Sequence, residues 1–126
     1  MHNRLKYLIL LISFILVHQN KGGAMGEKVN YKIMVEDKLK QVNISDGVNR
    51  EEAVIIAQNY LLKDNIKIEE LSFLSPKVRE SKIIKGCWAV VFDAKFKVRM
   101  ESGLHWFRVH IDKNTGEIKS RGWGPS

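Results

Sequence analysis

The sequence WFRVHIDKNTGEIK, residues 106–119, decides the fold class. Apolar and polar side chains alternate along its first half, which is the pattern of a strand with one buried face. The apolar positions are Phe107, Val109 and Ile111, and the alternating positions are Trp106, Arg108 and His110. Residues 112–116 (DKNTG) predict a tight loop, because Asn and Gly tolerate positive φ. The chain then turns back at Glu117, so this stretch predicts an antiparallel hairpin.

Three further apolar stretches precede the hairpin. Residues 87–92 (CWAVVF) are apolar on both faces, which predicts a central strand covered by a helix on one side and partly covered on the other. Residues 96–100 (FKVRM) alternate apolar and basic side chains and predict a second half-buried strand, or an extension of the first. Residues 71–74 stand before Ser75-Pro76, which favours an edge strand or a loop. With the hairpin, these stretches predict an antiparallel sheet of about four strands.

Residues 50–63 carry the clearest helix pattern. Asn49 is a favourable N-cap, and Glu52 occupies the capping-box position three residues later. An apolar stripe follows at helical spacing. Its members are Ala53, Ile56, Ala57, Tyr60 and Leu61. We therefore expect an α+β domain in which one main helix packs across the sheet.

The chain begins with the layout of a secretory leader. Arg4 and Lys6 precede an apolar run over residues 7–17, and Gly22-Gly23-Ala24 supplies small residues after it. As a helix, the run would reach only ~16 Å, about half of a bilayer's hydrocarbon core of roughly 30 Å. Residues 1–24 are thus interpreted as a signal peptide that exports the protein to the periplasm or the extracellular space. No stable membrane span is expected after cleavage.

The remaining 102 residues fit one domain. Residues 25–47 are interpreted as an N-terminal arm, with one short strand over residues 31–35 as an alternative. The net charge of +7 falls to about +4 without the leader, and the two signs alternate along the chain. A mixed, solvated surface is the simplest interpretation, and weak attraction to an anionic surface or an acidic partner is the other.

Three motifs follow in a fixed order: residues 51–53 (EEA) at the helix entry, residues 88–92 (WAVVF), and residues 109–117 (VHIDKNTGE). Their order and spacing over residues 48–120 resemble the PepSY family of small exported bacterial domains. That family begins a helix with Glu-Ala, has a Trp-x-Val-x-Phe strand, and ends in a Val-Asp-x-x-Thr-Gly-Glu hairpin. The long segment 66–86, with Pro76, and the ending Gly-Trp-Gly-Pro depart from this pattern.

The resemblance implies a PepSY-like domain over residues 48–126, with a helix across a curved antiparallel sheet of the cystatin-like type. PepSY-like domains occur in inhibitory propeptides of secreted metallopeptidases and in stand-alone envelope proteins, where they bind or restrain partners. We therefore expect a non-enzymatic binding or inhibitory module of the cell envelope with a protein partner. Two alternatives stay open. One is an immunity protein of the similar nuclear-transport-factor-like fold that neutralises a toxin, and the other is a small-ligand carrier or small hydrolase.

The residue pattern offers little for catalysis or cofactors. His105 and His110 are an odd number of residues apart, so one regular strand would send them to opposite faces and away from a shared metal. Nucleophile and base candidates are scattered, a glycine-rich phosphate loop is absent from the sequence, and nucleic-acid binding is not expected. Cys87 is the only cysteine, so an internal disulfide is excluded. A buried, inert thiol is favoured over an intermolecular disulfide or a redox role.

The most specific hypothesis concerns the row Trp106, Arg108, His110 and Asp112 on one strand face. In the simpler interpretation this row faces solvent, with Arg108 covering Trp106 and pairing loosely with Asp112. In the other interpretation Trp106, Arg108 and His110, together with Trp123, form a partner-binding surface, since Trp and Arg are common anchors of such surfaces.

Overall fold

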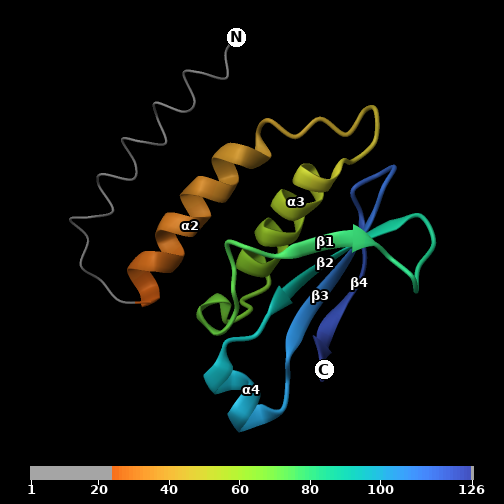
Figure 1. Ribbon diagram of the computed structural model, residues 1–126. Coiled ribbons are helices and arrows are strands. Elements are labelled where there is room, and N and C mark those ends of the chain that lie inside the picture. The colour runs from red at the N-terminus through yellow and green to blue at the C-terminus, as the bar shows by residue number, and fades with distance from the viewer. Residues whose placement is uncertain (1–23, 126) are drawn as a thin grey trace.

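The computed structural model describes residues 24–125, with side chains from residue 30 onward, so the predicted leader lies outside it apart from Ala24. The described chain contains three α-helices, one 3-10 helix and four strands (Figure 1). In chain order they are α2 (Ala24–Leu39), α3 (Arg50–Lys63), η1 (Ile68–Glu70), β1 (Lys77–Glu80), β2 (Cys87–Asp93), α4 (Phe96–Ser102), β3 (Trp106–Asp112) and β4 (Ile118–Gly124).

The four strands form one antiparallel sheet in the order β1-β2-β3-β4, which confirms the expected α+β class and strand number. The predicted hairpin is β3 and β4, and its return strand runs from Ile118 to Gly124. Val90 on β2 lies opposite Val109 on β3, and Phe107 lies opposite Trp123 on β4. A bulge between His110 and Ile111 shifts the last pairing.

Helix α3 has the predicted bounds and the predicted capping box. The Asn49 side chain accepts a hydrogen bond from the Glu52 backbone N–H at 2.8 Å, and the Glu52 carboxylate accepts one from the Asn49 N–H at 3.0 Å. Small side chains let this helix lie close to the sheet. Its fully buried residues Ala53, Ala57 and Leu61 share one cluster with residues of β2 and β3. The strand members of that cluster are Val90, Phe92, Phe107, Val109 and Ile111, so side chains fill the space between helix and sheet.

The predicted arm and short strand at residues 25–47 are wrong for most of their length, because residues 24–39 form the helix α2. The burial pattern explains the error. Tyr31, Met34 and Val35 pack inward at helical spacing, whereas Ile33, which the strand prediction placed beside Tyr31, is 46% exposed. The Tyr31 ring stacks on Phe73 with centroids 5.0 Å apart, and α2 packs against α3. Within residues 24–125, no helix combines the length and apolar content needed to cross a bilayer.

The predicted strand at residues 96–100 is also wrong, because these residues begin the helix α4. Sheet pairing ends at Asp93, and the helix closes on Gly103, whose φ of 76° is the left-handed conformation of a C-cap glycine. The stretch 71–74 contributes only an isolated bridge between Leu71 and Ala94. The actual edge strand β1 begins directly after Pro76.

Candidate binding surface on the open face of the sheet

Helices α2 and α3 lie on one side of the sheet, and the other side, here called the open face, carries the alternate residues of each strand (Figure 1). Strand register fixes its membership. The open face comprises Lys77 and Arg79 of β1, Cys87, Ala89, Val91 and Asp93 of β2, Trp106, Arg108, His110 and Asp112 of β3, and Ser120, Gly122 and Gly124 of β4.

The middle of the open face is a floor of small side chains. Cys87, Ala89 and Val91 on β2 are 2%, 2% and 9% exposed. Longer side chains flank them on both sides: Arg79 lies opposite Ala89, and Arg108 lies opposite Val91. Because neighbouring strands are spaced by about 4.8 Å, the backbones that carry these two arginines are roughly 10 Å apart across β2. We call this row of buried side chains along β2, with an arginine on either side, the strip.

Trp106 and Arg108 form a packed pair at one end of this strip. The Arg108 guanidinium carbon lies 4.6 Å from the centroid of the Trp106 ring, which confirms that Arg108 covers Trp106. On the other side, a Cβ built on Gly124 would overlap the Trp106 ring. Because residue 124 is a glycine, the Trp106 ring has room to pack against β4. Both side chains of the pair stay partly exposed.

The charges along the strip leave two arginines without an acid. Lys77 pairs with Asp93 at 3.3 Å, and Lys119 pairs with Glu117, also at 3.3 Å. Within residues 24–125, neither Arg79 nor Arg108 takes part in an ion pair. The open face therefore presents two guanidinium groups without an acidic partner in the described chain, and one of them, that of Arg108, stacks on Trp106.

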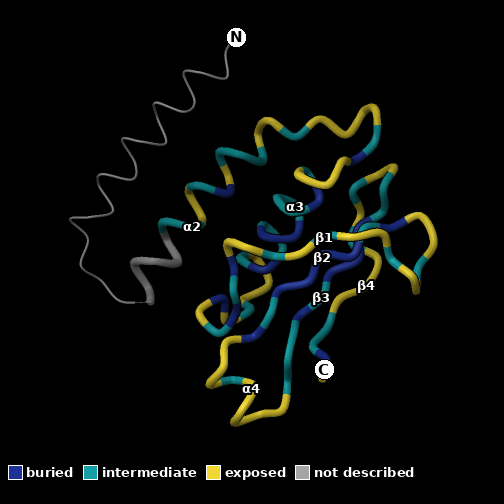
Figure 2. Tube along the Cα trace, viewed as in Figure 1, coloured by how far each residue is buried: buried dark blue, intermediate teal, exposed yellow. Residues whose placement is uncertain are grey.

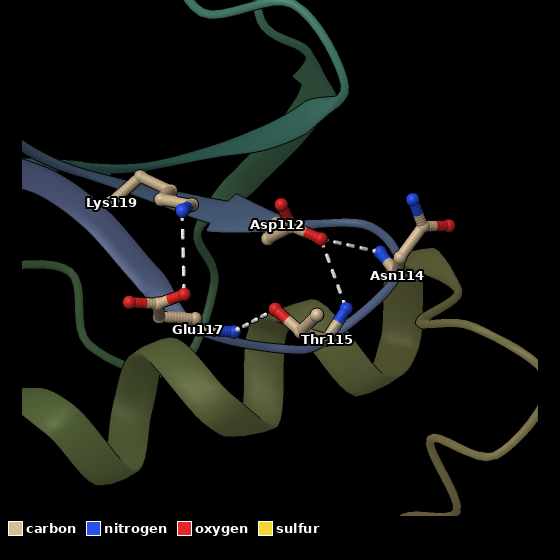
Figure 3. A network of polar contacts seen from close by, with 5 residues as sticks. All are labelled: Asp112, Asn114, Thr115, Glu117 and Lys119. Carbon is tan, nitrogen blue, oxygen red and sulfur yellow. Dashed lines mark hydrogen bonds and ion pairs between the residues drawn. The ribbon is translucent and has the colours of Figure 1, made fainter.

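The Asp112 carboxylate is hydrogen-bonded within the hairpin loop rather than paired with Arg108 (Figure 3). Its carboxylate accepts hydrogen bonds from the backbone N–H groups of Asn114 at 2.8 Å and Thr115 at 2.9 Å. These two bonds lower the pKa of the Asp112 carboxyl, with a smaller contribution from Lys119. The loose Arg108–Asp112 pair expected from sequence is thus replaced by a loop cap, and Arg108 keeps its charge available.

His110 lies under this surface rather than on it. The side chain is 3% exposed, and its Nδ1 atom has no hydrogen-bond partner among the described residues. Burial lowers the pKa of the His110 imidazole, and the nearby Arg108 charge lowers it further. We conclude that His110 supports the floor of the strip and cannot act as the exposed contact predicted from sequence.

Trp123 lies on the opposite face of the sheet. It is the cross-strand partner of Phe107, and their rings meet edge to face with centroids 5.4 Å apart and an interplanar angle of 73°. Trp123 therefore packs at the margin of the core under α3 and is not near Trp106 on the open face. Of the four predicted contact residues, only Trp106 and Arg108 are brought together at an accessible surface.

Sequence reasoning missed Arg79 and Gly124, because neither has a signal of its own. Arg79 enters the site only through its register with Ala89, and β1 was not recognised as a strand. Gly124 lies opposite Trp106 only because β4 extends as far as residue 124.

Two of the residues considered for catalysis, Cys87 and His110, are buried. Cys87 is a free, buried cysteine, and burial together with the Asp112 charge raises the pKa of its thiol, which confirms the predicted buried state. Residues 24–125 contain no group of three or more His, Cys, Asp or Glu side chains placed to hold a metal ion.

Comparison with known proteins adds no relative: no protein-family model matches this chain, and neither the curated proteins nor the solved structures contain a significant match.

Proposed function

We propose that this protein is an exported, non-enzymatic binding module of the cell envelope, PepSY-like with a cystatin-like sheet, that holds an acidic segment of a protein partner on its open face. The observation that carries the proposal is the strip along β2. Small side chains form its floor, and Arg79 and Arg108, both without an acid partner in the described chain, flank it. An extended segment running along β2 would lie between the two arginines, and guanidinium groups bind carboxylates in bidentate geometry.

Trp106 supplies the apolar contact that an acidic segment alone would lack. Trp and Arg are enriched among the residues that dominate binding energy, and here they already stack on each other at 4.6 Å. This stacking holds the arginine in place before a partner arrives, which reduces the entropy lost on binding. Cys87 and His110 are buried on this face, so the proposed contacts are made by Arg79, Trp106 and Arg108.

The test places a photo-crosslinking aromatic residue at Trp106 of the full chain in envelope extract of the source organism, with the same residue at Ile33 on α2 as control. Ile33 is 46% exposed and lies on a helix rather than on the sheet. We expect one dominant acidic protein to be crosslinked from residue 106 and not from residue 33. Capture should weaken as salt is raised, because exposed charges are screened.

A matched pair of variants separates binding from folding. R79Q/R108Q removes two cations from the open face and should abolish capture, whereas K32Q/K63Q removes two exposed cations from α2 and α3 and should not. Both should melt within a few degrees of the original protein, since exposed charges contribute little to stability. Equal capture by both variants would exclude the open face, and a large loss of stability in R79Q/R108Q would indicate a structural role for its arginines.

A further inference from the structure

The helix α4 projects from one end of the sheet, in the connection between β2 and β3 (Figure 1). Its base is fixed. The Ala94 N–H donates to the His105 carbonyl oxygen at 2.9 Å, and the Lys95 N–H donates to the Glu70 carbonyl oxygen at 2.9 Å. At its other end Gly103 closes the helix. These hydrogen bonds hold the projecting helix α4 to the rest of the fold.

The apolar side chains of α4 divide between two opposite sides. Residues of a helix turn by roughly 100° each, so Phe96 and Met100 share one side and Val98 lies on the other. Val98 packs against the core. Phe96 is 68% exposed and Met100 is 69% exposed, although both residue types are usually buried (Figure 2). The core thus anchors one side of α4 and leaves an apolar ridge in solvent.

Basic side chains border this ridge. Lys97 and Arg99 fall on its two sides by the same helical spacing, and Lys95 precedes the helix. All three are exposed, and none forms an ion pair within the described part of the chain. Glu101 is the only acid between residues 95 and 102.

We propose that α4 docks on the surface of an anionic lipid bilayer, with Phe96 and Met100 inserted at the boundary between headgroups and acyl chains and with Lys97 and Arg99 on the headgroup phosphates. An apolar ridge between cations is the pattern of a helix that lies in the membrane interface, because the two contributions add there. A protein groove would cover the ridge as well, but the flanking cations fit a continuous anionic surface better than a closed apolar groove.

The direction of the chain supports a bilayer as the occupant. Tyr31 of α2 and Lys95 at the base of α4 line one shallow groove, so the N-terminal half of α2 lies toward the α4 end of the molecule. In sequence, α2 is preceded by the apolar run of residues 7–17. That run is the part of the chain expected to enter a membrane during export, and in sequence it precedes the helix whose N-terminal half lies toward α4. The proposal does not depend on the function assigned to the open face.

The test uses the full chain with a single environment-sensitive fluorophore attached through M100C. Cys87 is 2% exposed and is not labelled in the folded protein, so the added thiol takes the label. The matched control carries the label through I83C. Ile83 is also an exposed apolar residue, at 67%, but lies in the loop between β1 and β2 at the opposite end of the sheet.

Both labelled proteins are mixed with phosphatidylcholine vesicles, with and without phosphatidylglycerol. We expect the label at residue 100 to shift to the blue and to resist aqueous quenchers on the anionic vesicles only, while the label at residue 83 stays in water. In the M100C background, K97Q/R99Q should weaken this contact roughly 25-fold, at about fivefold per cation removed.

Three outcomes would overturn the proposal: a label at residue 100 that stays accessible on anionic vesicles, equal protection on neutral vesicles, or equal protection at residue 83. Circular dichroism of each labelled protein confirms that the fold is kept, and the exposed positions of all substituted residues make this the expected result.

Discussion

Replacing Trp88 by phenylalanine should destabilise the protein by about 2 kcal/mol through the loss of one hydrogen bond. The Trp88 indole N–H donates to the Val48 carbonyl oxygen at 2.7 Å and so joins β2 to the residue that precedes the N-cap of α3. Val48 is 6% exposed, and its own N–H donates to the Lys113 carbonyl oxygen at 2.7 Å. Through these two hydrogen bonds Val48 connects the sheet, the entry of α3 and the hairpin loop.

The magnitude follows from these contacts. Losing a typical hydrogen bond costs about 1 kcal/mol, and the cost is about 1–3 kcal/mol where a buried carbonyl is left without its donor and water cannot reach it. The ring also carries Arg50 at 5.0 Å and Lys113 at 4.5 Å, and phenylalanine retains a weaker face for both cations. For a domain of this size, about 2 kcal/mol lowers the melting temperature by roughly 8–16 °C.

The assay is urea unfolding followed by circular dichroism, with W106F as the matched control. Trp106 makes the same type of ring contact with Arg108 but lies on the open face. W106F should therefore cost less than about 1 kcal/mol. If W88F is no more destabilised than W106F, the hydrogen bond between Trp88 and Val48 contributes nothing measurable to the free energy of unfolding. The explanation of how α3 is fixed to the sheet would then be wrong.

Three further substitutions test other parts of the structure. N49A should lower the free energy of unfolding by about 1 kcal/mol in denaturant titrations, because it removes the acceptor of the capping box while leaving the core unchanged. Burial lowers the pKa of His110 in the folded state, so the unfolded chain takes up a proton more readily and stability should fall as the pH drops below about 6.5. The slope in pH-dependent unfolding should be at most about 1.4 kcal/mol per pH unit, and H110Q should remove it; an unchanged slope in H110Q would assign it to another group. G124A should displace the Trp106 ring and weaken partner capture without removing any side chain proposed to touch the partner, and unchanged capture would mean that the position of the ring is unimportant.

Local patterns predicted the elements whose signals lie within a few residues. The capping residues and apolar stripe of α3 and the alternation of β3 each match the observed bounds, since hydrogen bonds and burial there follow the pattern of the segment itself. The segment 96–100 shows where this approach stops. Its apolar positions, spaced by two, fit a strand with one buried face, yet in the structure only Val98 is partly buried against the core, and Phe96 and Met100 are exposed.

The candidate site was predicted only in part because it depends on register across strands. Trp106 and Arg108 are two residues apart on one strand, so their contact follows from alternation alone. Arg79 and Gly124 join them only through pairing with other strands, which one sequence does not specify. Trp123 was placed with Trp106 by residue type, whereas its register opposite Phe107 sends it to the helix side of the sheet.

A partner on the open face and a bilayer against α4 can be bound at the same time, because the open face is a side of the sheet and α4 projects from its end. The strip with Arg79 and Arg108 runs along the flank of the sheet, and α4 projects beyond its end. A bilayer against Phe96 would therefore leave the flank accessible to a partner held beside the membrane. This separation predicts independent effects: R79Q/R108Q should leave contact with anionic vesicles unchanged, and K97Q/R99Q should leave partner capture unchanged. If either double variant lost both activities while keeping its melting temperature, the basic groups would act as one continuous surface, and the two assignments would have to be replaced by a single one.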